Sequence, residues 1–395
     1  MKRWFAAAVG VAAMLTAGFV YAWSILSAPI AAEFPAWTNA RLSLTFTLCM
    51  VFFCLSGMAA GFLAKKHPVS MNIRISAALF LASFFLTSRM HSLPALYITY
   101  GVLGGSASGF TYNSVLNAVP RWFPDRPGLI SGVLLMGFGA SSMVIGALYT
   151  AVTPAGFGAW RHTLALFGVA MAAILLGASF YLRPPRPEEI TAGAAGRSSA
   201  ARSRMPGEMM RHPPFWFFFL WAILTTAVGL IVISQARSLA RAAAPAISPG
   251  TLSLAVGLIS VCNGLGRILF GGLFDKIKEK TLWLVALCDL LGVGALALAM
   301  RGSLALLVAG FMIVGLGYGG TPPMNAAVVK DFYGLDHYPV NFSIINMNML
   351  PASFASTVSG MMYDASGGFR GILLLLTGIL AAALAVTAFV RRPPP

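Results

Sequence analysis

The sequence predicts an all-α membrane protein with twelve transmembrane helices arranged in two six-helix halves. Of its 395 residues, 58% are hydrophobic and only 10% are charged, whereas about a quarter of a water-soluble chain is usually charged. Apolar runs of about twenty residues, the length that spans a bilayer, recur along the whole chain. A polar segment near the middle separates six of these runs from the other six.

The spans are the apolar runs bounded by charged residues, Pro or Gly. In lipid every backbone polar group must be satisfied within the protein, so each run is expected to form a helix. The predicted spans lie near 4–31, 41–64, 70–88, 94–119, 127–152, 162–182, 214–236, 249–274, 281–299, 303–329, 338–362 and 370–390.

Residues 183–213 are predicted to be a surface linker. They are rich in Pro, Gly, Ser and Arg and have no apolar face, which is typical of flexible connections. The linker would divide the chain into an N-terminal six-helix bundle, 1–182, and a C-terminal six-helix bundle, 214–395.

The distribution of Lys and Arg predicts the orientation. The net charge of +16 would suggest a nucleic-acid partner in a soluble protein, but here the basic residues lie between the apolar runs, so we expect none. The side with both termini and the linker holds nineteen of the 27, the opposite side holds seven, and Arg267 lies within a span. The positive-inside rule then places both termini in the cytoplasm of a plasma membrane, which would be the inner membrane of a bacterium.

One alternative is that the N-terminus is a cleaved secretory signal. Lys2 and Arg3 precede an apolar run, and SAPIAA resembles a small-residue cleavage site. The run is longer than a usual signal core, and its removal would leave eleven spans. We therefore expect the first span to be retained.

The two halves contain an internal repeat. The stretch GFTYNSVLNAVPRWFPDR, which begins at Gly109, aligns without a gap with GGTPPMNAAVVKDFYGLD, which begins at Gly319. Both stretches end the fourth span of their half, where duplicated six-span halves should correspond.

Small residues at helical spacing predict close helix packing in lipid, and some of these faces could be sliding surfaces between moving helices. They are Gly57 and Gly61; Gly101, Gly105 and Gly109; Gly128 and Gly132; and Gly315 and Gly319.

Metal and cofactor sites are not expected. The four cysteines lie inside apolar runs without a CxxC or Cys/His spacing, and the five histidines all fall in connecting segments. No span therefore carries a histidine proton relay.

Three stretches are distinctive: GFVYAWSIL in span 1, WFPDRPGLISGVLLMGFGA from Trp122, and NGLGRILFGGLFDKIKEK from Asn263. They resemble the major facilitator superfamily, in the branch of the monocarboxylate transporters and the oxalate/formate antiporters. The resemblance implies the major facilitator fold and a carrier of small carboxylates. The chain departs from the pattern in GFLAKKHPVS after span 2, which lacks the acidic residue that many members have there.

Arg267 is the predicted carboxylate-binding residue. A charged side chain in the hydrocarbon region needs an oppositely charged partner, a water-filled cavity or enough length to reach the membrane interface. Among the predicted spans, only Arg267 and Asp289 are such side chains. A guanidinium can hold both oxygens of one carboxylate, with Asn263 one turn away on the same face. The alternative is an arginine that extends to the cytoplasmic interface.

The number of buried cations predicts the substrate's charge. Relatives that carry oxalate resemble this chain but add a lysine in span 11, where this sequence has Asn346, Met347 and Asn348. One arginine balances one negative charge, which favours a monocarboxylate such as lactate or pyruvate over a dianion.

Further polar residues of the spans are candidates for binding a hydroxyl or ketone group of the substrate. They are Tyr21, Asn113, Asn117, Tyr318 and Asn346. Each could equally be a polar contact between helices.

Asp289 is a candidate for proton coupling. Spans 8 and 9 form a hairpin, so Asp289 and Arg267 could lie at matching depth and form a salt bridge that opens on protonation. A structural polar contact is the alternative, because the ninth span of this fold usually stands outside the cavity. Animal monocarboxylate transporters, which the chain resembles at Arg267, have an aspartate where this chain has Asn263 and a lysine near Ile25, so their proton route does not transfer.

The expected mechanism is rocker-switch alternating access, in which an anion and a proton enter together and the halves rock about the bound site. Obligate exchange of two carboxylates without a proton is the rival within the same class. A membrane-embedded enzyme needs clustered acids, His pairs or a Ser/Lys dyad in the spans, and a channel needs a filter-like loop; neither is present. We expect one chain to suffice for transport.

Overall fold

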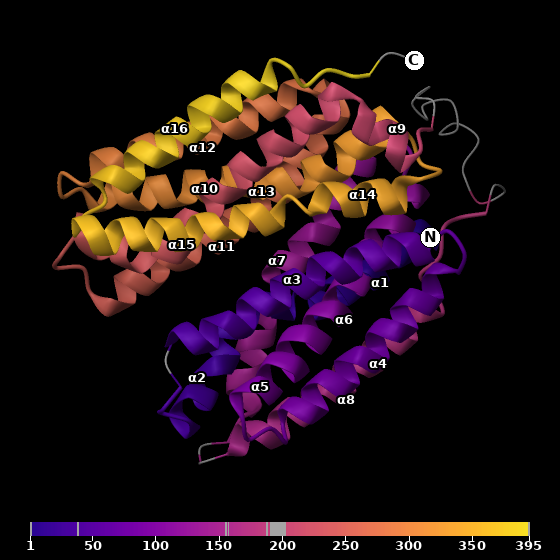
Figure 1. Ribbon diagram of the computed structural model, residues 1–395, viewed down its shortest axis with the longest axis horizontal. Coiled ribbons are helices and arrows are strands. Elements are labelled where there is room, and N and C mark those ends of the chain that lie inside the picture. Colours follow the sequence, from indigo (N-terminus) through magenta and orange to yellow (C-terminus); the bar gives the residue numbers. More distant parts are fainter. Residues whose placement is uncertain are drawn as a thin grey trace. The chain divides into compact units, whose positions relative to one another are not determined.

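The computed structural model describes residues 2–37, 39–154, 156, 158–186, 189 and 203–393. The regular elements of these residues are all helices (Figure 1). Ten helical stretches in this part of the chain are long and apolar enough to cross a membrane. The all-α membrane prediction is confirmed, and the two remaining predicted spans are helical but interrupted.

The first half of the chain follows the predicted spans closely. Its helices are α1 (Lys2–Ala17), η1 (Gly18–Ala22), α2 (Trp23–Glu33), α3 (Asn39–Leu63), α4 (Val69–Thr87), α5 (Leu93–Leu96), η2 (Tyr97–Gly104), α6 (Gly105–Ala118), η3 (Val119–Trp122), α7 (Pro127–Val152) and α8 (Ala159–Ser179). In Figure 1, α4 and α8 run side by side, and α3 packs along α6.

In the second half, the structure describes eight helices between residues 203 and 393. They are α9 (Pro206–Arg211), α10 (Pro213–Ala243), α11 (Pro249–Ile277), α12 (Lys280–Ala299), α13 (Leu304–Tyr333), α14 (Tyr338–Asn346), α15 (Met349–Ser366) and α16 (Arg370–Thr387). The helix α13 packs against both α11 and α12, while α16 packs against α10 and α12 (Figure 1).

The fourth and eleventh spans are the interrupted ones. In the fourth, a wide π-helical turn, η2, joins α5 to α6. In the eleventh, α14 ends at Asn346 and α15 begins at Met349. Such irregularities often accompany functional sites, and hydropathy cannot reveal them because the composition stays apolar.

By their contacts, the helices form two compact units. The first contains α1–α6, α7 from Gly137 onward, and α8, together with Phe342–Ile344. The second contains Arg126–Met136, at the start of α7, and the remainder of α9–α16. The predicted bundle boundaries, 1–182 and 214–395, differ from this grouping mainly in the placement of α7.

Each unit repeats the same glycine-mediated helix contact. In the first, a Cβ atom on Gly105 or Gly109 of α6 would lie 2.2 Å from the carbonyl oxygen of Cys49 or Phe53 in α3. In the second, a Cβ atom on Gly315 or Gly319 of α13 would lie 2.5 or 2.3 Å from the carbonyl oxygen of Ile259 or Asn263 in α11. Each position in the second set is its counterpart in the first plus 210, so the predicted alignment of Gly109 with Gly319 also describes the packing.

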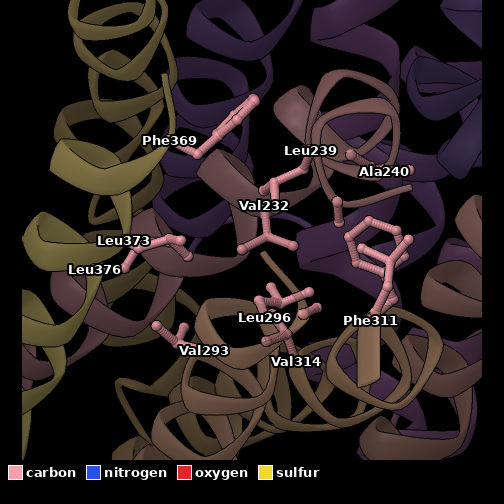
Figure 2. Close-up of a cluster of buried hydrophobic side chains, with 14 of the residues drawn as sticks. Val232, Leu239, Ala240, Val293, Leu296, Phe311, Val314, Phe369, Leu373 and Leu376 are labelled. Carbon is pink, nitrogen blue, oxygen red and sulfur yellow. The ribbon is translucent and has the colours of Figure 1, made fainter. Parts of the chain in front are cut away.

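An apolar core holds the second unit together. Figure 2 shows side chains of four helices gathered in it: Val232, Leu239 and Ala240 of α10, Val293 and Leu296 of α12, Phe311 and Val314 of α13, and Leu373 and Leu376 of α16, with Phe369 just before α16. All are at most 6% exposed. This packing fixes the backbone of α13, which carries several of the polar residues described below.

Arg161 connects three helices of the first unit at the end away from the linker. Arg161 at the start of α8 donates to Glu33 at the end of α2 (2.6 Å) and to the carbonyl oxygens of Ser88 (3.0 Å) and Met90 (2.7 Å) after α4. Trp160 donates its indole N–H to the same glutamate at 2.6 Å. The cluster therefore joins the ends of the first, third and sixth spans.

The last part of the predicted linker, from Ser203 onward, makes hydrogen bonds with the chain after α13. Ser203 Oγ accepts the backbone N–H of Asp336, and the backbone N–H of Arg204 donates to the carbonyl oxygen of Tyr333, both at 3.0 Å. Gly334 has a φ of +76° and lies so close to Ser203 that a Cβ atom would clash with it. Residues 190–202 lie outside the described part of the chain.

Candidate functional site

Arg267 lies in the C-terminal part of α11 and is only 3% exposed. Its Nε donates to the side-chain oxygen of Asn263 at 3.0 Å, as expected for residues four apart on one helix face. A terminal guanidinium nitrogen donates to the carbonyl oxygen of Leu135 in α7. Both acceptors are neutral, so they orient the cation without neutralising it.

The first turns of α7 pack closely against α11. A Cβ atom on Gly132 would lie 2.2 Å from the carbonyl oxygen of Arg267, and one on Gly128 would lie 2.3 Å from that of Gly271. The Asp275 carboxylate accepts the backbone N–H groups of Gly128 and Leu129, each at 2.9 Å. An acidic residue at a helix N-terminus satisfies unpaired donors and complements the helix dipole. Asp275 therefore holds the start of α7 on α11.

The polar residues of α13 lie beside α11 and α10. Asn263, which bonds Arg267, has its carbonyl oxygen against Gly319, and Gly266 lies against the carbonyl oxygen of Leu316. The ring of Tyr318 packs on Gly229 of α10 so closely that a Cβ atom there would be 2.1 Å away. Tyr318 is 5% exposed and thus buried within the second unit.

Asp289 of α12 is fully buried at the interface with α13. A Cβ atom on Gly317 would lie 2.2 Å from Asp289 Oδ1. The Asp289 carboxylate faces the backbone N–H of Tyr318, and no ion pair joins Asp289 to Arg267 within the part of the chain that the structure describes. The salt bridge expected between the two residues is therefore not formed in this structure.

Two buried hydrogen bonds connect the end of α14 and the residues after it to α13 and α10. Asn325 of α13 donates to the side-chain oxygen of Asn346 at 3.3 Å, and Thr226 of α10 donates to that of Asn348 at 3.4 Å. Asn346 was a predicted site residue, whereas Asn325 was missed. The signal was present in its position seven residues after Tyr318, on the same helix face.

The remaining predicted site residues belong to the first unit. Asn113 and Asn117 are buried in α6, as their spacing predicts. The side-chain oxygen of Asn117 accepts a bond from Arg121 at 2.9 Å. Tyr21 is partly buried, with its ring 5.3 Å from that of Phe138. The structure thus brings Arg267, Asn263, Tyr318 and Asn346 into one unit, and Tyr21, Asn113 and Asn117 into the other.

Lys330 is a further buried charged residue. Its predicted position was in the loop after a span ending at 329, but α13 continues to Tyr333 and Lys330 is 8% exposed. Its Nζ lies 3.3 Å from Ser131 Oγ and 4.7 Å from the centre of the Tyr338 ring. Arg267 and Asp289 are therefore not the only buried charged residues of the spans.

Metal-binding groups of three or more His, Cys, Asp or Glu side chains do not occur among the described residues. The chemistry available around Arg267 is instead that of an anion site, with one buried guanidinium and neutral amide and phenol groups.

The comparisons with known proteins identify the family. The family model described as Major Facilitator Superfamily matches residues 6–239 and 226–395. The chain belongs to the Major Facilitator Superfamily. Solved structures of this superfamily share its fold: the proton:xylose symporter XylE has a TM-score of 0.74 at 13% identity, over 98% of this chain and 95% of that one. The twelve-helix, two-half fold is thereby confirmed.

Three named proteins illustrate the sequence similarity. The MFS-type transporter YhjX of Escherichia coli (strain K12) is 27% identical over 87% of this chain and 84% of its own length. The oxalate:formate antiporter of Oxalobacter formigenes is 25% identical over 100% and 93%. Monocarboxylate transporter 13 of Bos taurus is 23% identical over 84% and 74%. The chain is therefore a multi-pass membrane transporter of the Major Facilitator Superfamily, as the resemblance implied.

Proposed function

We propose that the protein is a secondary active transporter of small monocarboxylates of the lactate or pyruvate type. The observation that carries this proposal is the buried guanidinium of Arg267, whose hydrogen bonds go to Asn263 and to the carbonyl oxygen of Leu135. No carboxylate pairs with it among the residues that the structure describes. A buried cation without a counter-charge is costly, and a carboxylate ligand would supply that charge together with two acceptor oxygens.

The uncompensated charge of Arg267 supports a substrate with a single negative charge. In the eleventh span Asn346 bonds Asn325 and brings no charge. Lys330 of α13 is a second buried cation, but it follows Gly319, the residue against Asn263, by eleven residues, or about 16 Å along the helix. A dianion at Arg267 would therefore keep one unpaired charge at low dielectric.

The bond between Arg267 and Leu135 suggests how binding starts the transport step. Without an anion, the guanidinium helps to join α11 to α7. An arriving carboxylate competes for the same N–H donors and releases the carbonyl oxygen of Leu135. In the rocker-switch mechanism, this loosening of α7 from α11 accompanies reorientation of the two halves around the bound anion.

Proton-coupled symport is the coupling mode that we propose, with Asp289 as the candidate protonation site. Its carboxylate lies against Gly317, one residue before Tyr318, so a change of charge at Asp289 acts on the backbone of α13 beside a candidate substrate-binding residue. Entry of a proton with a monoanion would keep the transport step electroneutral. We further propose Tyr21, Asn113, Asn117, Tyr318 and Asn346 as substrate-binding residues beside Arg267 and Asn263.

Carboxylate exchange is the second candidate function. The relative named oxalate:formate antiporter aligns over the whole chain, and acids and histidines embedded in the predicted spans are scarce. We propose in either case a carrier without catalytic activity or cofactor, which works as a single chain in the bacterial inner membrane with both termini in the cytoplasm.

The test is uptake of radiolabelled lactate into proteoliposomes with and without an inward proton gradient. Arg267→Gln removes the charge, and the matched variant Arg267→Lys keeps it without the planar guanidinium. We expect gradient-driven accumulation by the native chain, none with Gln and weak uptake with Lys. Uptake only with carboxylate trapped inside would support exchange, and lactate transport unaffected by Arg267→Gln would overturn the role of Arg267.

A further inference from the structure

We propose that Asn325 determines specificity by accepting a hydrogen bond from the hydroxyl group of a 2-hydroxycarboxylate, so that 2-hydroxy acids bind more tightly than 2-oxo acids. This inference rests on the proposed monocarboxylate function and adds a preference within that class of substrate.

The first observation is an unpaired acceptor. Asn325 is 3% exposed, and its Nδ2 is directed to the side-chain oxygen of Asn346 at 3.3 Å. Its own side-chain oxygen has no partner among the described residues. Buried polar atoms in native proteins usually have a hydrogen-bond partner, and an exception requires an explanation. The missing partner of Asn325 must be a donor.

The second observation is that other polar groups in this part of α13 also lack partners. Thr321, one turn before Asn325, has a buried hydroxyl group, able to donate or to accept, without a described partner. Pro322 and Pro323 lie inside the helix and have no backbone N–H. The helix therefore cannot supply the usual donors to the carbonyl oxygens of Tyr318 and Gly319. A ligand that donates a hydrogen bond is favoured here over one that only accepts.

The third observation is the depth of Asn325 relative to Arg267. The helices α11 and α13 are in register, because the Asn263 carbonyl oxygen meets Gly319 and the Phe270 ring meets Gly320. Arg267, between these two positions of α11, is therefore level with the turn that begins at Gly319. Asn325 follows Gly319 by six residues, which is about 9 Å along the helix axis.

The substrate chemistry fits this arrangement. In a 2-hydroxycarboxylate the hydroxyl oxygen is attached to the carbon next to the carboxylate, so its donor lies close to the charge that Arg267 binds. The hydroxyl can donate to Asn325 and accept from Thr321. A 2-oxo acid presents only lone pairs at this position and leaves the Asn325 oxygen unpaired, and sites that hydrogen-bond a hydroxyl discriminate strongly against analogues without it.

The experiment is calorimetric titration of the purified full-length protein with L-lactate, pyruvate and propionate. We expect the native protein to bind lactate about tenfold more tightly than pyruvate or propionate, which corresponds to one well-placed hydrogen bond. Asn325→Leu, with Asn325→Ala as a second variant of smaller volume, is expected to weaken lactate binding about tenfold and pyruvate binding less than twofold.

The matched control is Asn348→Leu, which removes a buried amide bonded to Thr226 and is expected to preserve the ratio of lactate to pyruvate affinity. Equal affinity of the native protein for lactate and pyruvate, or equal loss of both in the Asn325 variants, would overturn the inference and leave the monocarboxylate proposal standing. Binding of none of the three acids would instead overturn the proposed function, and this inference with it.

Discussion

Gly319 of α13 lies against the carbonyl oxygen of Asn263 in α11, and Asn263 in turn orients Arg267 through its side chain. One residue of α11 thus serves both the packing of the helix pair and the position of the buried cation. Its backbone contact depends on the absence of a side chain at residue 319, and its amide contact depends on the spacing of four residues within α11.

Replacing Gly319 by Ala is expected to destabilise the protein by about 1–3 kcal/mol, because the added Cβ atom meets backbone, which cannot move aside cheaply. Thermal unfolding in detergent measures this effect. Gly294→Ala on α12 is the control, because a Cβ atom there has no neighbour within 4 Å. An equal change of stability in both variants would contradict the role of the close contact with Asn263, because helix propensity alone favours Ala over Gly at both positions.

Asn263→Asp is expected to weaken anion binding by tenfold or more at pH 7.5, because a carboxylate 3.0 Å from Arg267 would occupy the guanidinium in place of the substrate. The Arg267 guanidinium would hold the new carboxylate in its charged form, so the loss of affinity should persist at pH 5.5. Lactate titrations at pH 7.5 and pH 5.5 test this. Asn263→Leu, which removes the amide without adding charge, should weaken binding less, and an equal loss in both variants would count against the explanation.

Asp275→Asn is expected to loosen the start of α7 by about 1–2 kcal/mol, since the neutral amide interacts less with the helix dipole and cannot accept both N–H groups equally well. Hydrogen–deuterium exchange of peptides covering residues 127–132 should become faster. The control is Asp331→Asn, whose partner Lys278 is 48% exposed, so that the pair contributes little. Unchanged exchange at the start of α7 would contradict the capping role.

The Glu33 cluster predicts a pH dependence of stability. Glu33 lies beyond the apolar run at 4–31; burial acts to raise its pKa, but hydrogen bonds from Arg161 and Trp160 outweigh burial and hold the pKa below its ordinary value of 4.5. A lowered folded-state pKa stabilises the protein above pH 4.5, and this contribution is lost as the pH falls through the folded-state value.

Glu33→Gln should therefore lower Tm at pH 7, by the equivalent of about 1 kcal/mol. The difference from the native chain should shrink steadily below pH 4.5. Thermal scans across this range measure it, with Glu189→Gln, which alters an exposed Arg183 pair, as the control. A difference that stays constant down to pH 3 would mean that the charge of Glu33 is not responsible.

The helices were predicted well because a chain in lipid must form all its backbone hydrogen bonds internally. Apolar composition is then enough to locate each span. Arg267 and Asn263 were predicted together because spacing on a single helix determines their contact. Asn325 was missed because its role depends on Asn346, which lies beyond a turn that sequence spacing does not describe. Lys330 was assigned to a loop because a lysine near the end of an apolar run usually reaches water. In the structure its ammonium group instead contacts the Ser131 hydroxyl and the Tyr338 ring.

The offset of 210 residues between the two sets of glycine contacts also assigns a counterpart to Arg267. That counterpart is Gly57 of α3, which has no side chain. The two helix pairs therefore repeat one scaffold, but only α11 has a charged side chain at this position. If Arg267 binds the cargo as proposed, the carboxylate stays with the same half of the carrier from loading to release.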